Sequence, residues 1–306
     1  MNSIELPDGL HVFERGWLSS NCILFDDGIT SWLVDSGYST HSDQTLELIA
    51  LKLGSRTLDF LINSHLHSDH CGGNAALQAK YPELVTVIPP GQSDLVKVWD
   101  PDGLFYTPTG QLCPRFKFEQ TLQCGSSFQL GLQKWEVHAT GGHDPHAVVF
   151  FESTSRVLIS ADALWQSGFG VVFPELEGVE AFNEVAATLD LIECLNPDVV
   201  VPGHGAVFKY TPEILVIARQ KLDGFIKDPV KLARHGAKVL LKFKLLEKQK
   251  LLYSDFCRWG ANTPCLLQYQ RQFFHRSDFP VWIDQLCSEL VKAGVAKREG
   301  DYILNQ

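Results

Sequence analysis

The stretch that decides the fold is Leu58–Gly73, which reads Leu-Asp-Phe-Leu-Ile-Asn-Ser-His-Leu-His-Ser-Asp-His-Cys-Gly-Gly. Its apolar first half predicts a short buried strand, and four polar side chains follow that strand directly. Side chains two apart in an extended segment project to the same side, so His65 and His67 can reach one metal ion together. Asp69 and His70 begin the next element and would face a second ion. Asp69 is expected to open a helix that runs through roughly residues 74–80, where its charge suits the helix N-terminus.

The spacing His65-x-His67-x-Asp69-His70 resembles the signature of the metallo-beta-lactamase superfamily. Members of that superfamily share an αββα sandwich and include glyoxalase II, lactonases, phosphodiesterases and RNase Z. The resemblance implies a four-layer αββα sandwich of the α/β class. It also implies three further metal ligands downstream, each placed after a strand.

Three segments satisfy that expectation in order. An alternating segment at 128–140 leads to His143, the apolar strand 157–161 ends on Asp162, and the buried strand 199–201 runs into His204. The resemblance then implies one ion held by three histidines, a second held by a mixed set, and a carboxylate between them. The three groups are His65, His67 and His143; Asp69, His70 and His204; and Asp162.

Nitrogen and carboxylate ligands without thiolate suit Zn²⁺, and iron or manganese fit almost as well. Two such ions can hold a bridging hydroxide at neutral pH and polarise a carbonyl or phosphoryl oxygen, and Asp69 or Asp162 would orient the hydroxide. The predicted function is therefore dinuclear metal-dependent hydrolysis of a small ester, thioester or lactone. Aromatic segments at 99–118 and 165–173 predict an apolar substrate pocket. The candidate pocket residues are Tyr106, His146, Trp165, Phe169 and Phe173.

Other functions remain open alongside this one. A phosphodiesterase or nuclease of the same fold is the second hypothesis, and a metal-binding sensor without turnover is the third. The family's mononuclear iron oxygenase branch lacks the full second-site ligand set, whereas Asp69, His70 and His204 are all present here. Asp35, at the end of the hairpin expected over 21–35, could support the metal site indirectly or could simply form a turn.

Composition predicts one large domain and an appendage. The 306 residues are 45% hydrophobic, enough for a large core. Residues 226–306 carry 14 basic and 8 acidic side chains, whereas residues 1–225 carry 12 and 28. We expect a catalytic domain at 1–225 and a helical extension at 226–306, with a small hairpin near 295–304 that loosely resembles a winged helix. Acidic residues interrupt any basic stripe, so packing or homodimerisation is expected of this extension rather than nucleic-acid binding.

Compartment and membrane association follow from simpler patterns. No run of about 18 apolar residues predicts a membrane span, and the segment Met1–Asp8 does not resemble an export signal. The eight cysteines are scattered, without a Cys-x-x-Cys pair, which is typical of free buried thiols in a reducing cytoplasm.

Overall fold

The computed structural model describes residues 4–306, so the first three residues of the segment Met1–Asp8 lie outside the described residues. The chain forms two compact units. The first comprises residues up to 100 together with 112–223, and the second comprises 101–111 together with 224–306. The predicted division after residue 225 lies near this boundary, but the sequence did not indicate that residues 101–111 pack with the second unit. The catalytic and accessory roles of the two parts stay predictions.

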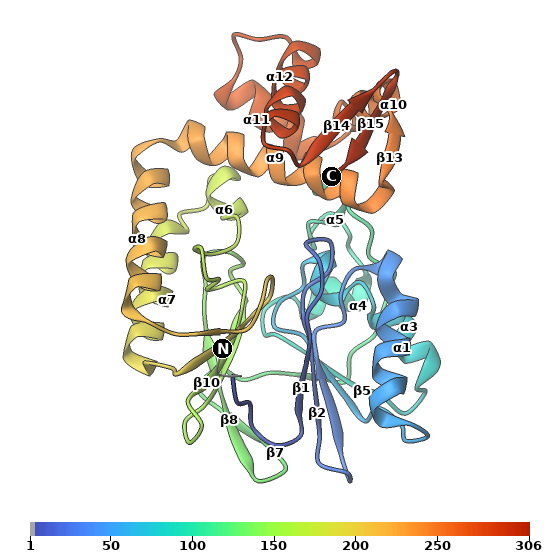
Figure 1. Ribbon diagram of the computed structural model, residues 1–306, viewed down its shortest axis with the longest axis vertical. Helices are drawn as coiled ribbons and strands as arrows, with labels where there is room; N and C mark the ends of the chain where they lie inside the picture. The colour runs from blue at the N-terminus through green and yellow to red at the C-terminus, as the bar shows by residue number, and fades with distance from the viewer. Residues whose placement is uncertain (1–3) are drawn as a thin grey trace. The chain divides into compact units, whose positions relative to one another are not determined.

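Two six-stranded sheets face each other in the first unit (Figure 1). Helices α1 and α3 cover the outer face of the first sheet, and α7 and α8 cover that of the second. The predicted αββα architecture is confirmed. The first sheet follows chain order from β1 to β6, antiparallel up to β3 and parallel beyond it. Its strands are β1 (Leu10–Phe13), β2 (Cys22–Asp26), β3 (Ser31–Val34), β4 (Phe60–Ile62), β5 (Val85–Ile88) and β6 (Gln120–Thr121).

The second sheet has the order β12-β11-β10-β9-β8-β7, and only the β10–β11 pair is parallel. The sequence pattern predicted a single strand over 128–140, which is wrong. The segment is a hairpin instead, because Gly131 adopts a φ of +57° and reverses the chain between two strands. The strands are β7 (Ser127–Leu130), β8 (Gln133–Ala139), β9 (Val148–Glu152), β10 (Val157–Ala161), β11 (Val199–Pro202) and β12 (Phe208–Lys209).

The core between the sheets follows from alternation along the strands. In β2, Ile23 and Phe25 join the core between the two sheets, whereas Cys22 and Leu24 pack toward the helices on the outer face. From the second sheet, Trp135 and Phe150 enter the core between the sheets and are fully buried. A sheet covered on both faces needs apolar side chains on both, and these strands provide them.

The helices of the first unit differ in their bounds from those expected. The single helix expected from Asp69 through residue 80 is divided into two, Ser68–Cys71 and Asn74–Lys80. Apolar residues at helical spacing also predict helices over 46–53 and 179–195. The first of these begins earlier, at Ser42, and the second begins later, at Phe182. None of the helices among residues 4–306 is both long and apolar enough to cross a membrane. The elements are η1 (Ser39–His41), α1 (Ser42–Leu53), α2 (Ser68–Cys71), α3 (Asn74–Lys80), α4 (Ser93–Val98), α6 (Phe173–Leu176), α7 (Phe182–Leu195) and α8 (Pro212–Lys227), the last of which runs across the boundary into the second unit.

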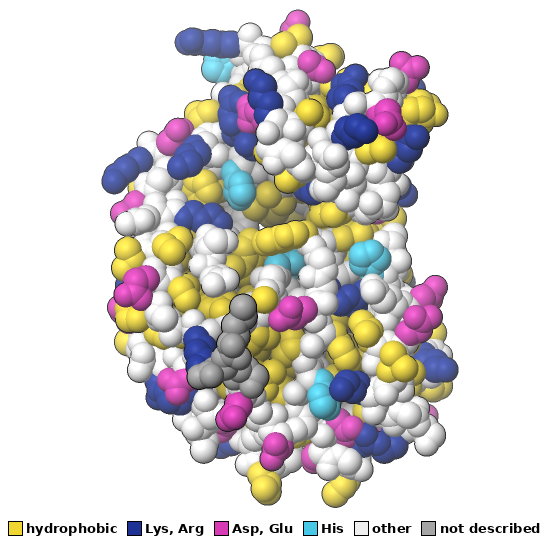
Figure 2. Space-filling model, in the orientation of Figure 1, with side chains coloured by type: hydrophobic (Ala, Val, Ile, Leu, Met, Phe, Trp, Pro, Cys, Tyr) yellow, Lys and Arg dark blue, Asp and Glu magenta, His cyan; other side chains and the backbone are white. Residues whose placement is uncertain are grey.

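The second unit is helical with a three-stranded sheet of order β13-β15-β14. The predicted C-terminal hairpin is confirmed. The aromatic segment 256–274 lies within the helical extension expected from the sequence. It is divided between two helices, because the first ends at Gly260 and Pro264 begins the second. On the face shown in Figure 2, Lys and Arg side chains of this unit are interspersed with Asp and Glu. Its elements are α5 (Tyr106–Thr109), α9 (Pro229–Lys248), β13 (Lys250–Leu252), α10 (Tyr253–Gly260), α11 (Pro264–Phe273), α12 (Phe279–Lys292), β14 (Ala296–Glu299) and β15 (Tyr302–Asn305).

Candidate metal centre

The segment after β4 is held in place by its own backbone. The amide of Ser20 donates to the carbonyl of Asp69 at 2.9 Å, and the amide of Ser36 donates to that of His70 at 2.7 Å. A Cβ at Gly72 would lie 2.4 Å from the carbonyl oxygen of Ser68, so only glycine permits this approach. These backbone contacts therefore hold the turn from which the histidines project.

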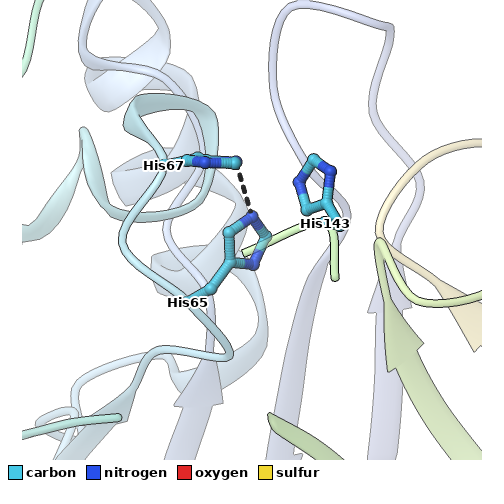
Figure 3. Close-up of side chains that lie close together, drawn as sticks. All are labelled: His65, His67 and His143. Atoms are coloured by element: carbon cyan, nitrogen blue, oxygen red, sulfur yellow. Dashed lines mark hydrogen bonds between the residues drawn. The ribbon is translucent and has the colours of Figure 1, made fainter. Parts of the chain in front are cut away.

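Three histidines form the first cluster. His65 and His67 come from the turn after β4, and His143 comes from the connection between β8 and β9 (Figure 3). The Nε2 atom of His65 lies 3.1 Å from Nδ1 of His67, and the ring centroids of His67 and His143 are 4.6 Å apart. One ligand atom from each of the three lies within 4.8 Å of the others, a spacing that one metal ion can bridge.

A second cluster contains Asp69, His70 and His204, whose ligand atoms meet the same 4.8 Å limit. His204 follows β11, and its Nε2 lies 3.2 Å from Oδ2 of Asp69. The two residues are 135 positions apart in the chain. The fold thus brings a second mixed set of nitrogen and oxygen donors together beside the first.

Asp162 lies between the two clusters. It follows β10 directly, and the parallel pairing of Ala161 with Pro202 places it next to the end of β11. Its Oδ2 lies 3.3 Å from Nε2 of His143, and its Oδ1 lies 3.4 Å from Nε2 of His70. Each carboxylate oxygen therefore faces a histidine of a different cluster, which is the placement that a bridging ligand needs. All seven predicted ligand residues are gathered in one place.

The outer nitrogens of two histidines are already engaged. Nδ1 of His143 donates to the carbonyl of Val171 at 2.7 Å, and Nδ1 of His70 donates to Oδ2 of Asp35 at 2.7 Å. The Nε2 atoms of both rings are buried, and neither has a hydrogen-bond partner among residues 4–306. Such a fixed outer contact with an unsatisfied inner nitrogen is the arrangement of metal-ligating histidines, so these residues fit a bound metal ion.

Burial and charge set the protonation of the cluster. Burial lowers the pKa of His65 well below its usual value and that of His143 to about 4, so both rings are neutral. Burial also opposes charge on Asp162, but the rings of His70 and His204 lower its pKa well below the usual range. For His70, the carboxylates of Asp162 and Asp35 outweigh burial and raise the pKa well above its usual value. His65, His143 and Asp162 therefore already have the protonation states that metal binding requires, whereas the His70 ring has to release a proton when an ion binds.

Asp35 is both a turn residue and a partner of the cluster. It adopts a φ of +60° at the end of β3, and its carboxylate also accepts hydrogen bonds from the amide and the hydroxyl of Ser64 at 2.8 and 2.7 Å. Parallel pairing of Val34 with Ile62 brings these two strand ends together.

We expect Asp35→Ala to weaken metal binding by roughly 10- to 100-fold, because the His70 ring loses the acceptor that orients it. Competition with a chromogenic chelator measures the affinity, and Asp35→Asn should fall between the variant and wild type. Asp59→Ala is the matched control, since Asp59 accepts from Ser31 just before β4, at the opposite end of that strand from the cluster. Wild-type affinity in Asp35→Ala would mean that Asp35 serves the turn alone.

The five residues predicted for the substrate pocket lie in different places. Trp165 donates from Nε1 to Oδ1 of Asp162 at 3.2 Å. Phe169 is buried and its carbonyl accepts from Nζ of Lys221 at 2.7 Å. Phe173 is buried at the start of α6, and the ring of His146 packs against Gly91. Tyr106 is buried in the second unit.

Sequence reasoning missed two residues near the cluster. Trp17 stacks on the His204 ring with 5.5 Å between centroids, and the ammonium of Lys221 lies 5.7 Å from the Trp165 ring and 4.8 Å from the Phe169 ring. Burial lowers the pKa of Lys221 to about 8. Neither residue carries a local signal, because a tryptophan between two strands and a lysine on an amphipathic helix are both common.

Comparison with known proteins identifies the family. The model described as the metallo-beta-lactamase superfamily matches residues 15–204. A hydroxyacylglutathione hydrolase from Brucella anthropi is 30% identical over 159 residues, which are 52% of this chain and 49% of that relative. A hydroxyacylglutathione hydrolase from Brucella ovis is 27% identical over 223 residues, covering 70% of this chain and 74% of the relative. The chain thus spans about half the length of the first curated relative and about three quarters of the second.

Among solved structures, the crystal structure of a metallo-beta-lactamase family protein from Thermus thermophilus is similar with a TM-score of 0.56. The match covers 98% of this chain and 99% of that one at 15% sequence identity, so it concerns the fold alone. The predicted superfamily and fold are both confirmed by these matches. The chain belongs to the metallo-beta-lactamase superfamily.

Proposed function

We propose that this protein is a dinuclear metal-dependent hydrolase of a small ester, thioester or lactone. The observation that carries the proposal is the position of Asp162, whose two oxygens lie 3.3 and 3.4 Å from histidines of two separate clusters. Superfamily membership supports hydrolysis, and so do the curated relatives, which are named as hydrolases of a hydroxyacylated glutathione.

The proposal assigns His65, His67 and His143 to one ion, Asp69, His70 and His204 to the other, and Asp162 to both. Zn²⁺ suits this nitrogen and oxygen donor set best, and iron or manganese would also fit it. A pair of such ions supplies Lewis acidity toward the substrate oxygen and acidifies water, so that a nucleophile exists at neutral pH.

Side chains of this protein orient the attacking water molecule and hold the metal ligands in position. Although burial opposes it, the hydrogen bond from His204 and the nearby His70 ring lower the pKa of Asp69, so its carboxylate is ionised. An ionised carboxylate accepts a hydrogen bond from a water molecule and orients it for attack. Asp162 is held in position by the indole Nε1 of Trp165, and the carbonyl of Val171 fixes the His143 ring. These contacts pre-organise the site before substrate enters.

A substrate panel run on metal-quantified protein tests the proposal. The panel contains thioesters, lactones, simple esters and bis(p-nitrophenyl) phosphate, and turnover of the carboxylic substrates is expected. Turnover of the phosphodiester alone would assign the protein to the phosphodiesterase or nuclease group, and salt-sensitive binding of RNA or DNA would then follow. Bound metals without turnover of any substrate would instead indicate a sensor.

The proposal also covers the cellular compartment of the protein and its macromolecular partners. We place the protein in the cytoplasm, supported by the eight cysteines, all free among residues 4–306. Four of them are buried, whereas Cys124 and Cys194 are exposed, a state that a reducing compartment preserves. Homodimerisation through residues 226–306 and the absence of nucleic-acid binding are predictions for size measurement and binding assays.

A further inference from the structure

Trp17 is unusual among the tryptophans of this protein. It lies between β1 and β2 and is 56% exposed, more than any other tryptophan among residues 4–306. A single exposed apolar side chain on a protein surface is ordinary and needs no function. What distinguishes Trp17 is that its ring is held against the metal cluster by other rings.

Three aromatic contacts fix this position. The indole of Trp17 is stacked on the His204 ring, 5.5 Å between centroids at an interplanar angle of 10°. Its edge meets Trp165 at 5.4 Å and 71°, and Trp165 in turn meets His204 edge-on at 5.5 Å and 80°. The three rings form a closed set, which we call the indole border, made of Trp17, Trp165 and His204. Since one face of Trp17 covers His204, its 56% exposure belongs largely to the other face and the rim.

The indole border is also tied to the reacting region. Trp165 donates to Asp162 at 3.2 Å, and His204 lies 3.2 Å from Asp69. A flat apolar surface therefore lies beside the two carboxylates assigned to catalysis, and its rings hold one another through three contacts. An ordered aromatic face binds a planar or large apolar group by stacking, and little conformational entropy is lost in doing so.

We propose that the indole border is a substrate platform, and that the natural substrate carries a planar aromatic or large apolar group beside its scissile bond. The inference rests on the proposed hydrolase function and deepens it, because it names the substrate class. Trp17 acts in binding the non-reacting part of the substrate. Trp165 both borders that group and positions Asp162.

Binding of two hydroxamates to the metal-loaded protein tests the platform without turnover. Benzohydroxamate and acetohydroxamate share the chelating group and differ in the phenyl or methyl group next to it. Wild type should bind benzohydroxamate about tenfold tighter, because stacking on an aromatic ring is worth roughly that factor. In Trp17→Ala that preference should fall at least about fivefold, and Trp17→Phe should keep most of it because it retains a stacking ring.

Leu132→Ala is the matched control, since Leu132 is a fully exposed apolar residue in the β7–β8 turn and should leave the preference unchanged. Metal content is measured for each variant, so that loss of an ion is not mistaken for loss of the platform. Equal affinities in wild type, or a preference that survives in Trp17→Ala, overturn the proposal.

Turnover provides the second readout. For acetyl and phenylacetyl thioesters of one thiol, the kcat/KM ratio should favour phenylacetyl, and Trp17→Ala should reduce that ratio mainly by raising KM for phenylacetyl. An equal loss on both thioesters would assign Trp17 a structural role and overturn the platform. If the protein hydrolyses no substrate but wild type still binds benzohydroxamate more tightly than acetohydroxamate, the proposed hydrolase function is rejected and the aromatic binding surface is retained. If the protein hydrolyses thioesters but shows no preference for the aromatic ligand, only the platform is rejected.

Discussion

Asp162→Ala should lower kcat/KM at least about 1,000-fold on whichever substrate the panel identifies, because the variant lacks the carboxylate proposed to ligate both ions. The two carboxylate oxygens of Asp162 face His143 and His70. Burial opposes ionisation of this carboxylate, but the rings of His70 and His204 hold its pKa well below the usual range. Steady-state kinetics with metal supplied in excess measures the effect. Metal content should fall from about two ions per chain to one or fewer.

Asp198→Ala is the matched control for this change. Asp198 immediately precedes the neighbouring strand β11, where its carboxylate pairs with Arg156, and it is not one of the seven clustered residues. Its activity and metal content should equal those of wild type. If Asp162→Ala retained more than about a tenth of wild-type kcat/KM, Asp162 could not be the shared ligand.

Phe150→Ala should reduce the free energy of unfolding by about 3 to 5 kcal/mol, because the ring is fully buried between the sheets and its removal leaves a cavity. Phe150 packs edge-on against Phe128 with 5.6 Å between ring centroids, so part of the loss is that aromatic contact. Urea unfolding of the metal-loaded protein, followed by circular dichroism, measures the difference between variants.

Two further variants should lose less free energy of unfolding than Phe150→Ala. Phe150→Leu keeps most of the volume and should cost clearly less, about 1.5 kcal/mol or below. Leu132→Ala removes a fully exposed side chain of the same sheet and should stay within about 0.5 kcal/mol of wild type. A loss under about 1 kcal/mol in Phe150→Ala would mean that the space between the sheets is not a packed core.

Much of the fold and site could be predicted because the relevant signals are local. A buried strand followed by His65-x-His67 places both rings at a strand end, whatever the rest of the chain does. The ligand-bearing segments near His143, Asp162 and His204 follow the same rule, because each lies just beyond a strand of the second sheet. Parallel pairing then aligns the ends of β10 and β11, so order along the chain becomes proximity in space.

The features that could not be predicted depend on partners distant in sequence. The aromatic content around 101–111 favours a pocket wall, but this segment belongs to the second unit, where α5 packs with α11. Nothing within the segment encodes that partner. Trp17 was missed for the same reason, since its importance comes from the His204 ring, far along the chain. The hairpin at Gly131 was missed because alternation continues through both strands.

The central claim is that seven side chains, gathered from the ends of four strands, hold two metal ions. Metal quantification by mass spectrometry on purified protein tests it most directly, in wild type, His67→Ala and His138→Ala. His138 is the matched control, because it lies on β8 and pairs with Glu136 and is not part of either cluster. The account predicts about two ions per chain in wild type and in His138→Ala, and clearly fewer in His67→Ala. It would be contradicted by one ion or none in wild type, or by an unchanged metal content in His67→Ala.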